Sequence, residues 1–149
     1  MSDWKVPLNQ THAVGVSREA IARKLKAKTT TGLRSGVLVI RDTDDDHIQV
    51  AGVDAVNVLG VLGKRNYTNP AWDHTTAPAE EDVLEVIPLG FASAVVARNG
   101  AALLAGAKVG STAGGLLKAA NASLPLSVVG YVPNDSDGSS AAVDALVVI

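Results

Sequence analysis

Residues 90–149 decide the fold: they begin Gly90-Phe-Ala-Ser-Ala-Val-Val-Ala97 and end Ala141-Ala-Val-Asp-Ala-Leu-Val-Val-Ile149. Short apolar runs in this stretch predict strands and alternate with turns of small residues, such as Gly110–Gly115. These runs are Phe91–Ala97, Ala101–Leu104, Leu126–Val132 and Ala141–Ile149. That alternation is typical of an all-β domain with tight turns. The stretch contains no Cys, His or Glu. It therefore offers few side chains for chemistry and favours binding and assembly over catalysis.

The composition indicates one ordinary domain with a core of small side chains. The chain has 149 residues and is 47% hydrophobic, but it has only five aromatic residues. Small side chains bury little apolar area each, so we expect the core to gain stability from a partner or from self-association. The chain has no cysteine, so no disulfide or thiolate site can form. No apolar run approaches the ~20 residues of a membrane helix, and we expect no membrane partner.

The net charge of −2 hides an asymmetry between the two ends of the chain. Residues 1–41 carry eight basic and two acidic residues, whereas residues 42–149 carry five basic and thirteen acidic residues. A basic arm on an acidic body predicts contacts between copies or docking on an acidic surface. Nucleic acid is the rival partner. Trp4 is the only aromatic ring in the basic stretch, so we expect no direct binding of nucleic acid.

We expect an extended N-terminal arm with one short helix over residues 1–35, and a β-rich body over residues 36–149. Ser17 resembles a helix N-cap, and Arg18–Lys28 fits a short helix with Ile21 and Leu25 on one face. A helix of this length is marginal alone in water. We therefore expect it to dock on the body or on a neighbouring subunit.

The body predicts short strands joined by tight turns. Val37–Ile40 and His47–Ala51 predict a hairpin around the acidic turn Asp42–Asp46. Ala55–Leu62 and Val83–Leu89 predict two further strands. Turn signals recur every eight to twelve residues, which is typical of a small β-sandwich or β-barrel.

The last strand and the longest loop both point to interfaces. The closing run is apolar on both faces, so we expect it to be covered on both sides, with another subunit as one candidate cover. Residues 64–81 predict a long irregular loop that contains Tyr67 and Trp72. Large rings in such a loop are typical interface anchors. The alternative is a loop that folds back over an open end of the barrel.

Two motifs suggest ligand binding but lack essential residues. Asp42, Asp44 and Asp46 match the first EF-hand positions, yet His47 replaces the required Gly and Val53 replaces the final Glu. A solvated acidic turn is therefore the interpretation, with weak cation binding as the alternative. Gly110–Gly115 is followed by two leucines where a phosphate-binding loop needs Lys and Ser or Thr, so we interpret it as a turn.

No set of residues for catalysis is found either. The three histidines (His12, His47 and His74) show no metal-ligand spacing, and we interpret them as surface or loop residues. The carboxylates of residues 80–85 precede a strand in a polar loop and favour a solvated face over an acid–base pair. We expect no catalytic residues, no metal and no cofactor, and the chain is predicted not to be an enzyme.

The whole pattern resembles the capsid cement, or head decoration, proteins of tailed double-stranded DNA bacteriophages. The residues that carry the likeness are Gly60–Gly63, Ile87–Phe91, Ala105–Gly110 with Gly114–Lys118, Val128–Val132 and Ala142–Ile149. The resemblance implies a protein on the outer capsid surface of the virion, assembled in the host cytoplasm. It further implies a homotrimer that bridges neighbouring subunits of the major capsid protein, without catalytic residues or a cofactor.

The leading hypothesis is therefore a virion structural protein that docks through its arm and its long loop. The residues expected to contact the capsid or another partner are Trp4, Arg18, Ile21, Arg23, Lys24, Leu25, Tyr67 and Trp72. Two alternatives remain open. One is a tail-tube or spike subunit, and the other is a carbohydrate-binding β-module that uses Trp72 and Tyr67.

Overall fold

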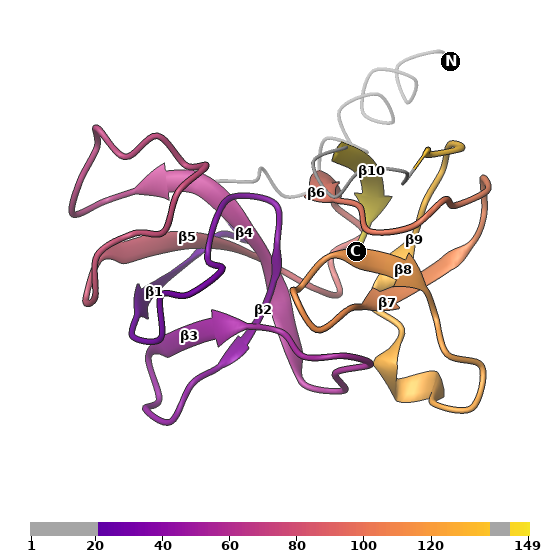
Figure 1. Cartoon of the computed structure of the whole chain (residues 1–149), viewed down its shortest axis with the longest axis horizontal. Coiled ribbons are helices and arrows are strands. Elements are labelled where there is room, and N and C mark those ends of the chain that lie inside the picture. The colour runs from indigo at the N-terminus through magenta and orange to yellow at the C-terminus, as the bar shows by residue number, and fades with distance from the viewer. Residues whose placement is uncertain (1–20, 138–143) are drawn as a thin grey trace, which may run out of the picture.

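The computed structural model describes residues 21–137 and 144–149 and shows a mainly β protein with two sheets (Figure 1). The predicted fold class is confirmed. Within the described ranges, no helix has the length and apolar character to cross a membrane. The elements are β1 (Arg23–Ala27), β2 (Leu38–Arg41), β3 (His47–Val50), β4 (Val58–Asn66), β5 (Val83–Pro88), β6 (Ala94–Arg98), β7 (Lys108–Ser111), β8 (Leu117–Ala119), the 3₁₀ turn η1 (Pro125–Ser127), β9 (Gly130–Tyr131) and β10 (Asp144–Val148).

The first sheet is a small barrel whose strand pairings close on themselves in the order β1-β3-β2-β4-β5. Strand β1 closes the ring, because it pairs parallel with β3 and antiparallel with β5. Strands β2 and β3 form an antiparallel hairpin, and the hairpin predicted around Asp42–Asp46 is confirmed. Figure 1 shows this barrel beside the second sheet.

The helix predicted over Arg18–Lys28 is wrong from Arg23 onward, because Arg23–Ala27 forms β1. Burial in this strand alternates, with Leu25 and Ala27 inside the barrel. Two partner strands far along the chain supply its hydrogen bonds, and they outweigh the weak helix preference of so short a segment. Strand β1 and the buried Leu33, which were expected in the arm, are therefore part of the barrel. Residues 18–20 lie outside the described ranges.

The second sheet contains the strands of residues 90–149 in the order β6-β10-β9-β7-β8, and all of its pairs are antiparallel. Two predicted strands are shorter than expected. Ala101–Leu104 contributes only an isolated bridge, between Leu103 and Ser136. Residues 126–132 contain η1 and the two-residue strand β9. Pro125, directly before this run, begins η1, so the run starts in a 3₁₀ turn and not in a strand.

The core has two parts because the barrel strands are buried on both faces. Val37, Val39 and Leu62 face the barrel interior. Leu38, which lies between two of these residues, instead joins the cluster shared with the second sheet. That shared cluster includes Val147 and Ile149 at the end of the chain. Unfolding either sheet would therefore expose core residues of the other.

Backbone hydrogen bonds also fix the two sheets against each other. The Arg98 N–H donates to the Gly36 carbonyl at 2.8 Å, and the Leu38 N–H donates to the Gly115 carbonyl at 2.8 Å. The Asp54 N–H donates to the carbonyl of Ser111 at 2.9 Å. Because these bonds join the loops at the boundary, surfaces on the two sheets keep a fixed relation.

Candidate interaction surfaces

The structure separates the predicted contact residues into buried and exposed ones. Ile21 and Leu25 are only 8% and 6% exposed and belong to the two parts of the core. Both side chains pack inside this molecule and are not accessible partner contacts in this structure, Leu25 because β1 turns it into the barrel and Ile21 because it packs in the core shared with the second sheet. Trp4 and Arg18 lie outside the described residues.

Lys24 and Tyr67 form a small exposed surface on the barrel. Lys24 is exposed, Tyr67 is 38% exposed, and Arg23 at the start of β1 is exposed as well. The Lys24 ammonium lies 4.5 Å from the centroid of the Tyr67 ring, a distance typical of a cation–π contact. Of the predicted contact residues in the described chain, Lys24 and Tyr67 are brought together in an accessible position, and Arg23 is exposed at the start of the same strand as Lys24.

Trp72 takes the other role that the sequence left open for the long loop. Its half-buried ring packs against the barrel core, and its indole N–H donates to the carbonyl of Thr76 at 2.9 Å. Asn66 orders the start of the same loop by accepting the N–H groups of Thr68 and Asn69. The loop thus folds back onto the barrel at Trp72 while Tyr67 stays accessible.

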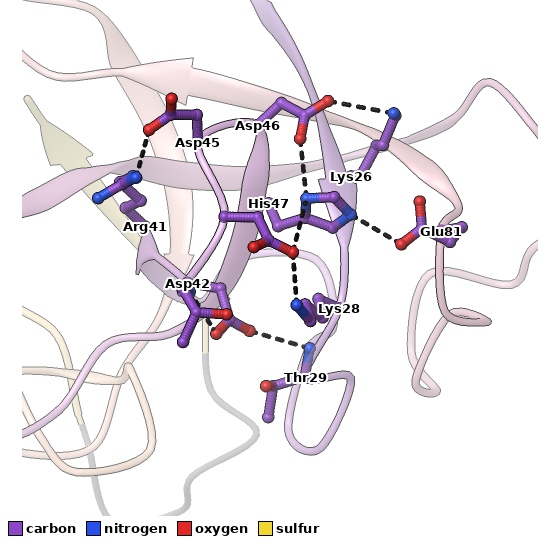
Figure 2. A network of polar contacts seen from close by, with 11 residues as sticks. Lys26, Lys28, Thr29, Arg41, Asp42, Asp45, Asp46, His47 and Glu81 are labelled. Atoms are coloured by element: carbon purple, nitrogen blue, oxygen red, sulfur yellow. Dashed lines mark hydrogen bonds and ion pairs between the residues drawn. The ribbon is translucent and has the colours of Figure 1, made fainter.

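The acidic turn is held to the barrel by ion pairs (Figure 2). Lys26 on β1 lies 3.1 Å from Asp46, and Lys28 forms an ion pair with Asp44. Asp42 accepts the N–H groups of Thr29 and Thr43. The Thr29 side chain, followed by the N–H groups of Thr43 and Thr29, lowers the pKa of the Asp42 carboxyl below its ordinary value by hydrogen bonding to it. Arg41 pairs with Asp45 in the same turn.

His47 lies at the centre of this network and is not the surface residue that the sequence predicted. It is 8% exposed. Its Nε2 lies 2.7 Å from a Glu81 oxygen, and its Nδ1 forms an ion-pair contact of 2.8 Å with Asp46 (Figure 2). The hydrogen bond to Glu81, aided by the charges of Asp46 and Asp44, raises the pKa of the imidazole. The spacing of residues in the sequence could not reveal this contact, because Glu81 lies 34 residues from His47.

The network changes the interpretation of the charge asymmetry. Lys26 and Lys28 belong to the predicted basic arm, yet they are engaged by carboxylates of the same molecule. Among the described residues, no cluster of three or more potential ligands is arranged to hold a metal ion. The acidic turn therefore acts as a partner for the barrel's own lysines.

Sequence reasoning missed most of the exposed apolar surface, which lies mainly on the second sheet. One row crosses the outer face of that sheet, because Ala94, Val148 and Tyr131 are successive cross-strand neighbours, and such neighbours point to one face. Val96 lies on the same face of β6 and is 53% exposed, while Tyr131 is 46% exposed. The prediction that the closing strand has two apolar faces pointed to this surface without locating its neighbours.

A second apolar surface, the loop rim, is formed where residues 51–57 meet residues 120–127. An ion pair between Asp54 and Lys118 and a hydrogen bond from Asn121 to Asp54 join the two loops. The Lys118 hydrogen bond, followed by that of Asn121, lowers the pKa of Asp54. The same two loops carry four exposed aliphatic side chains: Val53, Val56, Leu124 and Leu126.

Comparison with known proteins gives one informative likeness. No protein-family model and no curated protein matches the chain. Among solved structures, the chain is similar to the N base of the head fibre protein gp8.5 of bacteriophage phi29. The TM-score is 0.55 at 16% sequence identity, and the match covers 87% of this chain and 93% of that chain. At this identity the likeness shows a shared fold.

Proposed function

We propose that the chain is a non-enzymatic structural protein of a bacteriophage virion that binds the outer capsid surface. There it would stabilise the shell by bridging neighbouring subunits of the major capsid protein. The observation that carries this proposal is the fold shared with a head fibre base along nearly the whole of both chains. That neighbour is a fibre base and not a decoration protein, so the cementing role is the finer part of the proposal.

The exposed surfaces fit a protein that binds a shell by shape and apolar contact. Val96 and Tyr131 lie on the outer sheet face, and Leu126 in the loop rim is 81% exposed. Apolar patches on a soluble domain are typical of interaction sites. In Figure 1 β6 and η1 lie at opposite ends of the second sheet, so one molecule presents two separate apolar surfaces.

The intramolecular pairing of Lys26 and Lys28 also supports a protein partner over nucleic acid. A phosphate backbone is bound by basic side chains that are free to neutralise it, and these two are already neutralised. A homotrimer remains part of the proposal. It predicts a mass of three chains in solution by light scattering, whereas a tail-tube or spike subunit would form rings or filaments.

The proposal is tested by co-sedimenting the purified protein with capsids from the phage that encodes it. We expect saturable binding that Leu126→Asp weakens by at least about tenfold without altering thermal unfolding, because this side chain is already exposed. Ala77→Asp is the matched control, because it adds the same charge at an exposed position that belongs to neither apolar surface. Absence of saturable binding would refute the proposal. Glycan binding abolished by Trp72→Ala would favour the carbohydrate-binding alternative instead.

A further inference from the structure

Strand β6 is an edge of the second sheet, and its outer edge carries unused backbone groups. The sheet order places β6 at one end, where it pairs with β10 alone. The Ser93 and Ile149 backbones exchange hydrogen bonds of 3.1 and 3.0 Å. Because hydrogen-bonded pairs alternate along an antiparallel ladder, Val95 bonds to β10, whereas Ala94 and Val96 direct their N–H and C=O groups outward.

Arg98 is the next residue of β6 whose N–H should point away from β10, and its hydrogen bond agrees with this direction. Arg98 donates its N–H to the Gly36 carbonyl at 2.8 Å, away from β10. Among the described residues, no backbone group forms a hydrogen bond with the outward N–H and C=O groups of Ala94 or Val96. Proteins usually protect such edges. Here Gly36 protects only the Arg98 end, and the remainder is a template for another strand.

A pocket of about 350 Å³ lies beside this edge. Its walls are Ala94–Val96 of β6 and Val61–Lys64 of β4, with Ile87 of β5. The volume lies near the lower limit for ligand pockets, so it suits a short segment of chain. A strand added to β6 would turn alternate side chains toward Val61 and Ile87, which favours apolar residues at those positions.

The titratable groups of the pocket are all of basic residue types. Lys64, His74 and Arg98 line it, and among the described lining residues there is no Asp or Glu. Arg98 is oriented by donating its Nε–H to the Ser35 carbonyl at 2.8 Å, and the His74 Nδ1 lies 3.0 Å from the Ser35 hydroxyl. Residues 42–149 are acidic as a whole, so a basic pocket here indicates an acidic group in the ligand.

We propose that the groove beside β6 binds an extended, acidic peptide segment of another polypeptide chain. The segment adds as a strand next to β6, exchanges backbone hydrogen bonds with Ala94 and Val96, and places a carboxylate near Lys64 and Arg98. In strand addition, backbone bonds supply affinity and side-chain pockets supply specificity. The inference rests on the edge and its pocket, independently of the capsid proposal.

Fluorescence anisotropy with the full-length protein tests the proposal. The probes are two labelled eight-residue peptides of alternating Val and Thr, one with two Glu at its N-terminal end and one with two Glu at its C-terminal end. We expect one of them to bind saturably. Methylation of its alternate backbone nitrogens should weaken binding at least about tenfold, because each methyl removes a donor. Replacement of Glu by Lys should weaken it similarly.

Three variants of the protein test whether the peptide binds beside β6. Val96→Pro removes an outward N–H that no β10 bond needs, and an edge strand tolerates proline at such a position. We expect at least about tenfold weaker binding, whereas the matched Val96→Thr keeps the donor and the affinity. Lys64→Glu should weaken the acidic peptides and strengthen the Lys peptides. Lys64 is chosen for charge reversal in place of Arg98. Arg98 also donates a hydrogen bond to the Ser35 carbonyl and is paired with Asp144 in the β6–β10 register, so its replacement would disturb the fold as well.

Several outcomes would overturn the proposal. Equal affinity of the methylated and unmethylated peptides, or no saturable binding, rules out strand addition, whether or not the proline variant folds. If Val96→Pro dissociates an oligomer and leaves peptide binding unchanged, a second copy occupies the edge. If the Val96 amide of the isolated protein is protected from hydrogen exchange at all dilutions, the chain covers its own edge.

Discussion

The barrel and the second sheet share a core but differ in their surface side chains, which are mostly paired polar groups on the barrel and exposed hydrophobic groups in the second-sheet region. The barrel joins its acidic turn, β1 and the residue 79–82 loop through ion pairs centred on His47. Six of the nine large exposed hydrophobic residues in the described chain lie between Phe91 and Tyr131. The comparison indicates that the barrel's polar groups serve its own stability, whereas the second sheet keeps apolar area for a partner.

The largest expected effect comes from removing residues 1–35, the arm predicted from the sequence. The deletion removes β1 and with it Leu25 and Ala27 of the barrel interior. Because the shared cluster unites both sheets, we expect both to unfold, which circular dichroism and proton NMR would show. Deleting residues 1–20 alone is the control and should leave the folded signals. A folded second sheet after the longer deletion would show that the two regions are independent.

The next largest effect is expected when one glycine in each sheet is replaced by alanine. A Cβ at Gly60 would lie 2.0 Å from the Ile87 carbonyl oxygen, and a Cβ at Gly130 would lie 2.0 Å from that of Val148. Both contacts are with backbone that cannot rotate away. We therefore expect Gly60→Ala and Gly130→Ala each to lower the free energy of unfolding by about 3 kcal/mol, the upper range for overpacking.

Urea unfolding, followed by one probe in the barrel and one in the second sheet, measures these losses of stability. Gly52→Ala is the control, because its Cβ would meet no atom within 4 Å, and it should change stability little. Coincident transitions of the barrel and the second sheet in both variants would support a shared core. Two separate transitions would show that the barrel and the second sheet unfold independently.

A smaller effect should distinguish the regions by pH. The folded pKa of His47 is raised by Glu81, so its stabilisation is complete below the unfolded value of about 6.5 and is lost as pH rises through the folded value. We expect the urea midpoint to fall over that interval in the native protein and to stay flatter in His47→Gln. His74→Asn, which alters a histidine that contacts Ser35, should retain the native profile. An unchanged profile in His47→Gln would refute the role of the network.

Local patterns in the sequence were enough to predict the strands bounded by clear turns. The β2–β3 hairpin followed from an apolar run, an acidic turn and a second run, and β5 followed from alternation. Strand β1 could not be predicted in the same way. Ile21 and Leu25 are four residues apart, which fits a helix, and the pairing of Arg23 with Val86 spans 63 positions.

The candidate site depended even more on contacts between distant residues. Tyr67 was predicted as an interface anchor and is 38% exposed, which leaves it accessible to a partner. His47 was misplaced, because its burial depends on the loop that contains Glu81. The outer sheet face was missed because Tyr131 and Ala94 become neighbours of Val148 only in the register of the folded sheet.

The smallest expected effect compares two tyrosines that are similarly exposed. Lys24 lies over the Tyr67 ring of the barrel. On the second sheet Lys108 is the cross-strand neighbour of Tyr131, but no such contact with its ring is found among the described residues. A double-mutant cycle of Lys24→Gln and Tyr67→Leu should give a coupling free energy of about 0.5–1 kcal/mol.

The matching cycle of Lys108→Gln and Tyr131→Leu should give a coupling close to zero in the same urea unfolding assay. Equal couplings at the two sites would show that the barrel does not differ from the second sheet in how it uses its exposed rings. Coupling confined to the Lys24 pair would mean that even an exposed ring of the barrel is stabilised within the molecule. The ring of Tyr131 would then stay available for a partner.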